Sequence, residues 1–216
     1  CLEHNFLGRI FKALIPKAFT TAKRVRSETR ISEFAVSISF AAVELGKRIF
    51  SNLSEQTVMI IGAGEMAELA VKHLLKNGVS RILVTNRTFA NAVKLAEEYQ
   101  GSAIQFSQLL DYLPRADIVI SSTGSSHYIL TQDMVKHCLK ERKGRPIFFI
   151  DIAVPRDIDP LVNGLPGVYC YDIDDLQNVV DKNRKEREKE AKEAEKIVEE
   201  EVIKAHSWFK TQSAIP

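Results

Sequence analysis

A glycine-rich turn is the part of this sequence whose residue types and spacing point most directly to chemistry. An apolar segment, 57–61, runs into Gly62, Ala63, Gly64, Glu65, Met66 and Ala67, which together read Gly-x-Gly-x-x-Ala. Gly62 allows a tight turn, Gly64 lets the backbone approach a phosphate, and Ala67 lets a helix pack closely on the strand. The start of that helix would offer free N–H groups to an anion. The turn therefore predicts a pyrophosphate site for a dinucleotide. The alternative is a glycine turn of an α/β domain without a ligand.

The segment after the next predicted strand, Asn86-Arg87-Thr88, bears on which dinucleotide would bind. A site for NAD usually has Asp or Glu here to accept from the ribose 2′-OH, and a carboxylate would repel a 2′-phosphate. A guanidinium with amide and hydroxyl donors would hold that phosphate through charge-assisted hydrogen bonds. The sequence therefore favours NADP over NAD. The alternative is an exposed Arg87 beside Thr88 as a helix N-cap, and both roles can coexist.

Two further segments are expected at the same edge, because ligands of parallel sheets bind beyond the carboxyl ends of the strands. One follows the predicted strand 117–121 and the other ends the predicted strand 147–152. The cofactor-binding residues predicted there, on the ribose and nicotinamide side, are Ser122, Thr123, Gly124, Asp151, Ala153 and Val154. Ordinary turn and capping chemistry is the alternative for each of them. His127 lies close in sequence and is either an assisting group or a surface histidine.

These segments need a framework, and the pattern from residue 57 to about 172 supplies one. Near-continuous apolar strands are predicted at 57–61, 81–85, 103–106, 117–121, 147–152 and 168–171. Helices are predicted at 65–77, 89–100 and 131–141, with a helical turn at 107–113. The first of these helices is expected to bury Leu69, Ala70, His73 and Leu74. Such alternation predicts an α/β fold with a doubly wound parallel sheet.

Length and composition limit the remaining possibilities. The chain has 216 residues, enough for one full core and a small appendage. It has no apolar run of the roughly 18 residues that a transmembrane helix needs, and no secretory pattern, so a soluble protein is expected. Cys1, Cys138 and Cys170 are odd in number and lack CxxC spacing. Neither a disulfide framework nor a metal site is indicated, and Cys138 is expected to be packing material rather than a nucleophile.

Charge is concentrated near the N-terminus. Residues 1–50 hold nine Lys and Arg against four Asp and Glu, with a cluster at 23–30 that includes Lys23, Arg24 and Arg26. This cluster suits either a phosphate backbone or, more commonly, a solvated helix end. Before it, Phe6, Ile10, Phe11 and Leu14 predict an amphipathic helix that Pro16 interrupts or restarts. Residues 33–50 have helical spacing, although the alternation at 36–40 also suits a strand.

The C-terminal segment predicts one long helix. From Asp174 to about Phe209 the chain has no Gly or Pro, and opposite charges four residues apart include Arg184/Glu188. A helix of about 35 residues would be about 50 Å long, more than a compact domain needs. A weak apolar seam follows it, formed by Leu176, Val180, Ala191, Ala194, Val198, Val202, Ala205 and Phe209. The far half is therefore expected to pack on a partner helix or a second subunit, unless it is a frayed charged tail.

Seven motifs, in this order and spacing, resemble the glutamyl-tRNA reductase family over nearly the whole chain. They are Lys-Arg-Val-Arg-Ser-Glu-Thr at 23–29, Val-Ser-Ile-Ser-Phe-Ala-Ala-Val-Glu-Leu at 36–45, Gly-Ala-Gly-Glu-Met-Ala at 62–67, Asn-Arg-Thr at 86–88, Ser-Ser-Thr-Gly at 121–124, Asp-Ile-Ala-Val-Pro-Arg-Asp-Ile-Asp-Pro at 151–160 and Tyr-Asp-Ile-Asp-Asp-Leu at 171–176. The resemblance implies NADPH-dependent reduction of glutamyl-tRNA to glutamate-1-semialdehyde, early in tetrapyrrole (porphyrin) biosynthesis. It also implies a catalytic domain, an NADPH domain and a dimerisation domain along one spinal helix.

The resemblance further implies that this chain is a fragment. Its three ranges would be the end of the catalytic domain with a linker at 1–50, an NADP-binding Rossmann domain at 51–173, and a spinal helix at 174–216. The family's nucleophilic cysteine lies in a Thr-Cys-Asn-Arg-like motif that is absent here, so no catalytic residue is assigned and the fragment is expected to bind NADPH without turnover.

For the full-length protein, the resemblance implies glutamyl-tRNA as substrate and a homodimer. It also raises glutamate-1-semialdehyde aminomutase as a partner, and a cytoplasmic location, or the plastid stroma in a plant. Two alternatives stay open: another NADP-dependent oxidoreductase of the shikimate-dehydrogenase type, and a non-enzymatic interaction module.

Overall fold

The computed structural model describes residues 8–31 and 37–213 of the chain. The chain divides into two compact units, one formed by residues 35–180 and the other by 1–34 with 181–216. These units differ from the ranges 1–50, 51–173 and 174–216 predicted from the sequence, because the helix at 38–49 packs with the sheet. The three-domain division stays a prediction about the whole protein.

The unit of residues 35–180 contains one six-stranded sheet in the order β3-β2-β1-β4-β5-β6, with every neighbouring pair parallel. The strands are β1 (Thr57–Gly62), β2 (Arg81–Asn86), β3 (Ser102–Gln105), β4 (Ile118–Ser122), β5 (Ile147–Asp151) and β6 (Val168–Asp172). The chain starts in the middle of the sheet, winds outward through β2 and β3, and returns to β4 on the other side of β1. This is the order of a doubly wound Rossmann sheet, so the predicted fold class is confirmed.

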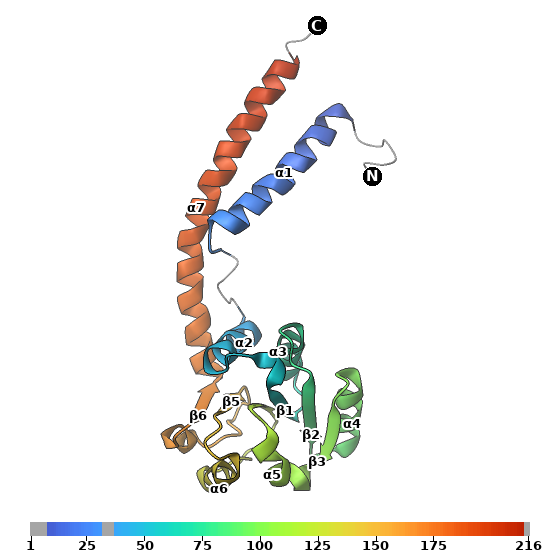
Figure 1. The fold of residues 1–216 in the computed structure, drawn as a ribbon, viewed down its shortest axis with the longest axis vertical. Coiled ribbons are helices and arrows are strands. Elements are labelled where there is room, and N and C mark those ends of the chain that lie inside the picture. The colour runs from blue at the N-terminus through green and yellow to red at the C-terminus, as the bar shows by residue number, and fades with distance from the viewer. Residues whose placement is uncertain (1–7, 32–36, 214–216) are drawn as a thin grey trace. The chain divides into compact units, whose positions relative to one another are not determined.

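Helices cover both faces of this sheet (Figure 1). One face carries α2 (Ile38–Ile49), α3 (Glu65–Lys76), α4 (Phe89–Glu98) and the first turns of α7 (Ile173–Ser213). The other carries α5 (Leu109–Tyr112), α6 (Gln132–Arg142) and the 3₁₀ turns at 113–115 and 160–164. Alternate residues of β1 enter the two cores, Val58 and Ile60 on one side and Met59 and Ile61 on the other. The strands are therefore apolar throughout because both faces are buried.

The structure corrects one local prediction in this unit and decides between two alternatives for another. Leu69, expected on the buried face of its helix, is 49% exposed, and the buried stripe of α3 is Ala67, Ala70, Val71 and Leu74. The stripe therefore begins two residues earlier, because small Ala67 lets the first turn lie directly on the sheet. For 36–40 the helical alternative holds from Ile38 onward, since Ser37 caps α2 by accepting from the N–H of Phe40. Residues 33–36 lie outside the described part of the chain.

The amino-terminal edge of the sheet is held by a buried ion pair. The guanidinium of Arg142 is 2.9 Å from the carboxylate of Asp117 and donates to the backbone carbonyls of Pro114, Ala116 and Pro146. The second oxygen of Asp117 accepts from the N–H of Thr57 at 3.0 Å. This network fixes the starts of β1, β4 and β5, because the donors of Arg142 are directed to protein acceptors. Thr57, Asp117, Arg145 and Pro146 also border a cavity of about 900 Å³ at this edge of the sheet.

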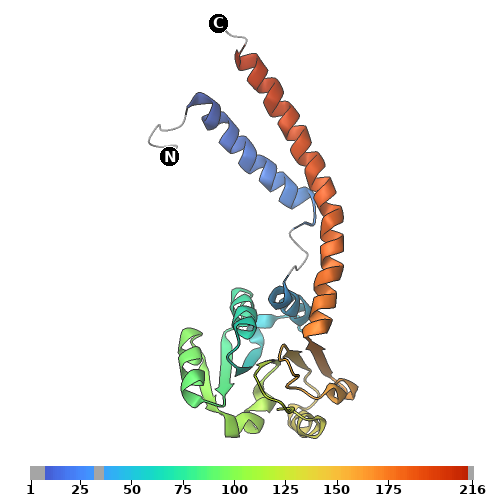
Figure 2. The same ribbon diagram turned by 180° about the vertical axis from the view of Figure 1, so that it is seen from behind.

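The second unit pairs α1 (Arg9–Glu28) with the part of α7 that follows residue 180. Both views show the two helices nearest each other at the C-terminal end of α1 (Figures 1 and 2). Pro16 lies inside α1 without ending it, so the predicted interruption is wrong. A proline removes only one backbone donor, and the helix continues on either side with Thr20 donating to the carbonyl of Pro16. Phe6, part of the predicted stripe, lies outside the described residues.

The contacts between α1 and α7 identify the partner of the long helix. Arg24 lies 2.7 Å from Glu201 and 2.8 Å from Glu28, and the N–H of Arg30 donates to Glu190 at 2.8 Å. The ammonium of Lys17 lies 5.2 Å from the ring centroid of Trp208, within cation–π range. α1 is therefore a partner helix of α7 within this chain, and one guanidinium of the basic cluster is used in ion pairs. It does not cover the apolar seam, because Val198, Val202 and Phe209 stay 43%, 58% and 42% exposed.

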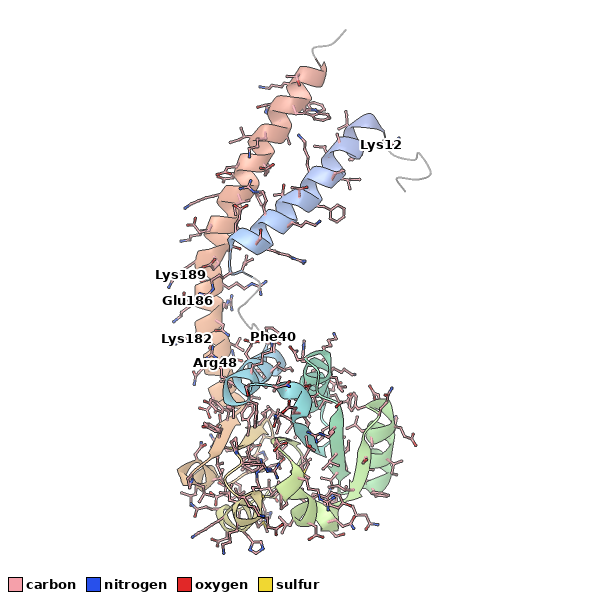
Figure 3. The ribbon with its side chains drawn as sticks, viewed as in Figure 1. Lys12, Phe40, Arg48, Lys182, Glu186 and Lys189 are labelled. Carbon is pink, nitrogen blue, oxygen red and sulfur yellow. The ribbon has the colours of Figure 1, made fainter. Side chains whose placement is uncertain are left out.

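The long helix itself is confirmed, with 41 residues from Ile173 to Ser213. Arg184 and Glu188 form the predicted pair at 3.5 Å, whereas Lys189 pairs with Glu186, three residues away, at 2.8 Å. Lys182, Glu186 and Lys189 follow one another along α7 (Figure 3), and these lysines lower the pKa of the Glu186 carboxyl. Within the described residues, no helix is long and apolar enough to cross a membrane.

Candidate nucleotide-binding site

A cavity of about 920 Å³ lies at the carboxyl ends of the strands, where the loops after β1, β2 and β4 meet. This is the point at which the sheet order reverses between β1 and β4, the usual ligand position in such sheets. Its volume lies within the range of about 300 to 1,000 Å³ typical of small-molecule sites. Of the predicted site residues, the lining includes Gly62, Ala63, Gly64, Asn86, Arg87, Ser122, Thr123 and Gly124.

The neighbouring strand β4 leaves little room for a side chain at either glycine of the turn, in addition to the room that a ligand would need. Gly62 has φ +99°, and a Cβ there would lie 2.2 Å from the carbonyl oxygen of Ser122. A Cβ on Gly64 would lie 2.2 Å from the hydroxyl oxygen of the same serine. Gly62 is therefore required by its conformation and by strand pairing, whereas a side chain on Gly64 would have to displace the hydroxyl of Ser122. Both add a structural reason to the predicted ligand role.

The start of α3 faces this turn. Gly64 is its N-cap residue and provides no capping side chain. The first N–H groups of the helix therefore lack a capping partner from that residue and are suited to an anion. Ala67 is fully buried against the sheet, as predicted for close packing. Glu65 is exposed, and neither it nor Ala67 lines the cavity, so a contact from these two residues would come through the backbone. The side chain of Met66 lies outside what the structure describes.

The segment after β2 presents one side chain to the cavity and uses another internally. The side-chain oxygen of Asn86 accepts from the N–H of Thr88 at 2.9 Å, which shapes the turn into α4. Thr88 occupies the N-cap position, but its hydroxyl makes no capping hydrogen bond. Arg87 lies exposed at the cavity. Among residues 8–31 and 37–213, its side chain forms no ion pair. Its guanidinium is therefore available to an anionic ligand.

The loop after β5, unlike the other predicted segments, contributes none of its predicted site residues to the cavity lining. Asp151, Ala153 and Val154 do not line the cavity. The buried carboxylate of Asp151 accepts from the N–H groups of Ala153, Asp157 and Ile158, and burial raises its pKa. Val154 is 76% exposed. Asp151 therefore organises its own loop, and a cofactor contact from these three residues stays a prediction.

Three side chains considered for reactivity, those of His127, Cys138 and Cys170, are either hydrogen-bonded or have a raised pKa. The ring nitrogen Nδ1 of His127 lies 2.8 Å from the hydroxyl of Ser126, and His127 is exposed outside the cavity lining. Burial raises the pKa of Cys138 to about 11 and that of Cys170 to about 12, which disfavours the thiolate that a nucleophile requires. Within the described ranges, no cluster of three or more His, Cys, Asp or Glu is arranged to hold a metal.

Part of the cavity wall was not predicted from the sequence. It is formed by Asn91 and by apolar side chains and their neighbours, namely Phe106, Ser107, Leu109, Leu110, Ser125, Tyr128, Ile129 and Met134. Phe106 directly follows β3, so the rule that residues after strands face the ligand could have found it. Asn91 lies on α4, Ser107 lies in the 3₁₀ turn 106–108, and the others lie on α5, on α6 or in the loop before α6. No local pattern distinguishes them from core residues.

Comparison with known proteins agrees with this architecture. The sequence profile of the family described as Shikimate / quinate 5-dehydrogenase matches residues 44–179. Glutamyl-tRNA reductase of Geobacter sulfurreducens is 54% identical over 214 residues, covering 99% of this chain and 49% of the relative. That of Syntrophus aciditrophicus is 49% identical, covering 100% and 51%. The chain therefore spans about half the length of the curated relatives it matches.

Solved structures give the same result. A glutamyl-tRNA reductase from Methanopyrus kandleri superposes with a TM-score of 0.89 at 40% identity, covering 95% of this chain and 52% of that one. The nucleotide-binding domain of glutamyl-tRNA reductase from Thermoplasma volcanium has a TM-score of 0.56 at 17% identity, which shows the fold alone. This chain belongs to the shikimate / quinate 5-dehydrogenase domain family, and along nearly its whole length it is similar to glutamyl-tRNA reductases.

Proposed function

We propose that this chain is the NADPH-binding portion of a glutamyl-tRNA reductase, which reduces glutamyl-tRNA to glutamate-1-semialdehyde in tetrapyrrole biosynthesis. The observation that carries the cofactor assignment is the cavity at the switch point of the sheet, which gathers the glycine turn, Arg87 and the segment after β4. The reaction is assigned from the identity of 54% to a glutamyl-tRNA reductase over 99% of the chain. The whole protein would act as a cytoplasmic homodimer, with the aminomutase as a partner that takes its product.

The geometry suits a bound dinucleotide. Gly62 and Gly64 leave the mouth of the turn free of side chains, and the start of α3 would hold the pyrophosphate. Arg87 would hold the 2′-phosphate of the cofactor, since no carboxylate lines the cavity among the described residues to repel that group. Ser122 to Gly124 would face the ribose and nicotinamide side, with contacts from Asp151, Ala153 and Val154 if the loop after β5 turns toward it. The cofactor would supply hydride to the glutamyl carbonyl carbon.

Cofactor titration tests this proposal. We expect the purified chain to bind NADPH more tightly than NADH, followed by the fluorescence of the reduced nicotinamide. Substitution R87D should reverse or abolish this preference, because it places a carboxylate where the 2′-phosphate would lie. The substitution K94D, on the exposed side of α4 outside the cavity lining, is the matched charge control and should leave the preference unchanged. Equal binding of both nucleotides, or none, would refute the assignment.

Turnover tests the second part of the proposal. This chain lacks a Thr-Cys-Asn-Arg-like motif, and its described thiols have raised pKa values, so we expect nucleotide binding without reduction of glutamyl-tRNA. The family profile also makes shikimate oxidation with NADP⁺ a rival activity. Measurable turnover of glutamyl-tRNA by this chain, or of shikimate, would contradict the proposed division of labour.

A further inference from the structure

One buried carboxylate near the cavity has no part in the proposed cofactor contacts. Asp157 lies in the loop after β5, is completely buried, and does not line the cavity. Its carboxylate accepts three hydrogen bonds, all from the end of β4 and the segment that follows it. The donors are the hydroxyl of Ser121 at 2.7 Å, the N–H of Thr123 at 2.9 Å and the hydroxyl of Thr123 at 2.6 Å.

The backbone of the same residue holds the other end of that segment. The carbonyl oxygen of Asp157 accepts from the N–H groups of Ile129 at 2.6 Å and Leu130 at 3.1 Å. The loop 121–130 is therefore tied to a single residue at its start, through the side chain, and at its end, through the main chain. This loop supplies six residues of the cavity lining, Ser122, Thr123, Gly124, Ser125, Tyr128 and Ile129.

The middle of the loop is connected to the same carboxylate through Thr123. Its hydroxyl donates to Asp157 and accepts from the N–H of Ser125 at 3.1 Å. The hydroxyl of Ser125 in turn donates to the carbonyl of His127 at 2.7 Å and accepts from its N–H at 3.2 Å. Since both hydrogen-bonding directions of the Thr123 hydroxyl are used, the loop would offer a ligand mainly its backbone and its apolar side chains.

The charge of Asp157 explains why this arrangement is specific. Within the described ranges 8–31 and 37–213, the carboxylate of Asp157 forms no ion pair. Hydrogen bonds alone therefore compensate the buried charge. Hydrogen bonds to an ionised acceptor are shorter and stronger than those between neutral groups. A buried carboxylate that loses its donors is costly, and donors that lose the carboxylate are equally left unpaired. The loop and Asp157 therefore hold each other in one geometry.

We propose that Asp157 is a positioning residue for the nucleotide cavity: it fixes the 121–130 loop from behind, so that the backbone of 122–124 lies at the cavity wall in the shape that the cofactor requires. This inference rests on the proposed function. It assigns to Asp157 a role that acts through Thr123 and Ser121 rather than through contact with the ligand.

The test measures NADPH dissociation constants, well below the melting temperature, for the single variants D157A, S121A and T123V, and for D157A and S121A each combined with T123V. We expect D157A to bind about tenfold or more weakly, because hydrogen bonds to a charged group are lost. We expect S121A to bind several-fold more weakly although Ser121 does not line the cavity. T123V should add little to D157A, because both act on the same contact. The matched control is D159A, in the same loop, whose carboxylate accepts from the N–H groups of Leu161 and Gln132 and not from the 121–130 loop.

Hydrogen exchange of the protein without nucleotide gives the second readout. We expect faster exchange of the amides of 121–130 in D157A, with the amides of β1 unchanged. Wild-type affinity in D157A, or additive effects of D157A and T123V, would overturn the positioning role while leaving cofactor binding intact. If D157A fails to fold, S121A decides alone: unchanged affinity overturns the proposal. A wild-type chain that binds no dinucleotide would overturn the proposed function itself and this inference with it.

Discussion

Substitution of Gly62 by alanine tests the geometry of the turn at its most constrained point. Gly62 has φ +99°, a conformation that costs a residue with a side chain about 1 to 3 kcal/mol. Its new Cβ would lie 2.2 Å from the carbonyl oxygen of Ser122, where β1 and β4 are paired, and the shift needed would cost about 1 to 3 kcal/mol more. The free energy of unfolding should therefore fall by about 2 to 6 kcal/mol.

Two glycines of the same cavity serve as comparisons. A Cβ on Gly64 would meet the hydroxyl oxygen of Ser122, which can rotate away, and the backbone there (φ −82°, ψ 145°) suits any residue. G64A should therefore cost about 1 kcal/mol or less, and S122A should relieve most of that cost. A Cβ on Gly124 would have no atom within 4 Å, so G124A should change stability by about 0.5 kcal/mol at most.

Urea unfolding followed by circular dichroism measures these differences. With a slope of about 2 kcal/mol per molar urea, G62A should lower the midpoint by about 1 to 3 M. Because α1 and α7 also contribute to the signal, the slowest amides of β1 and β4 should be followed by hydrogen exchange in parallel. If G62A were as stable as G124A, neither the positive φ nor the approach of Ser122 to the turn would be correct.

Three further predictions concern groups outside the turn. R142M should lower the free energy of unfolding by about 3 to 5 kcal/mol in urea titrations, because it removes the buried ion-pair partner of Asp117 and the donor to the carbonyls of Ala116 and Pro146. R145M, at a side chain 56% exposed, should cost about 1 kcal/mol or less. Burial raises the pKa of Asp151, so the folded state binds its proton more tightly than the unfolded state. The stability of wild type relative to D151N should therefore be greatest below the unfolded pKa of about 4 and should decrease as pH rises through the raised folded value; a constant difference in urea titrations across pH 3 to 7 would contradict this. Cys138, with a pKa of about 11, should resist iodoacetamide at pH 8 in the folded protein and react in guanidinium, as peptide mass spectrometry would show.

The sequence was sufficient for the elements and for the edge at which the site lies. Strands such as 57–62 are buried on both faces, which leaves an unbroken apolar run, and the helices between them carry their own periodicity. The glycine turn could also be recognised from the sequence, because a positive φ and a close approach by a neighbouring strand both disfavour side chains and so leave glycines in the sequence. The absence of Gly and Pro over 174–209 was enough to predict the long helix.

Other features depended on which distant segments the fold brings together. Two aspartates six residues apart, Asp151 and Asp157, look equivalent in the sequence, yet one organises its own loop and the other holds the loop after β4. The apolar wall containing Phe106 and Met134 joins segments that follow different strands. The partner of α7 is α1, from the opposite end of the chain.

Local patterns therefore determined the strands, the helices and the predicted phosphate-binding turn, because these depend on dihedral preferences and on the period of buried positions. The tertiary structure alone decided which side chains line the cavity and which support it from behind. The reason is that the order of the strands brings the loops after β4 and β5 to one edge, and hydrogen bonds between those loops have no signature within either segment.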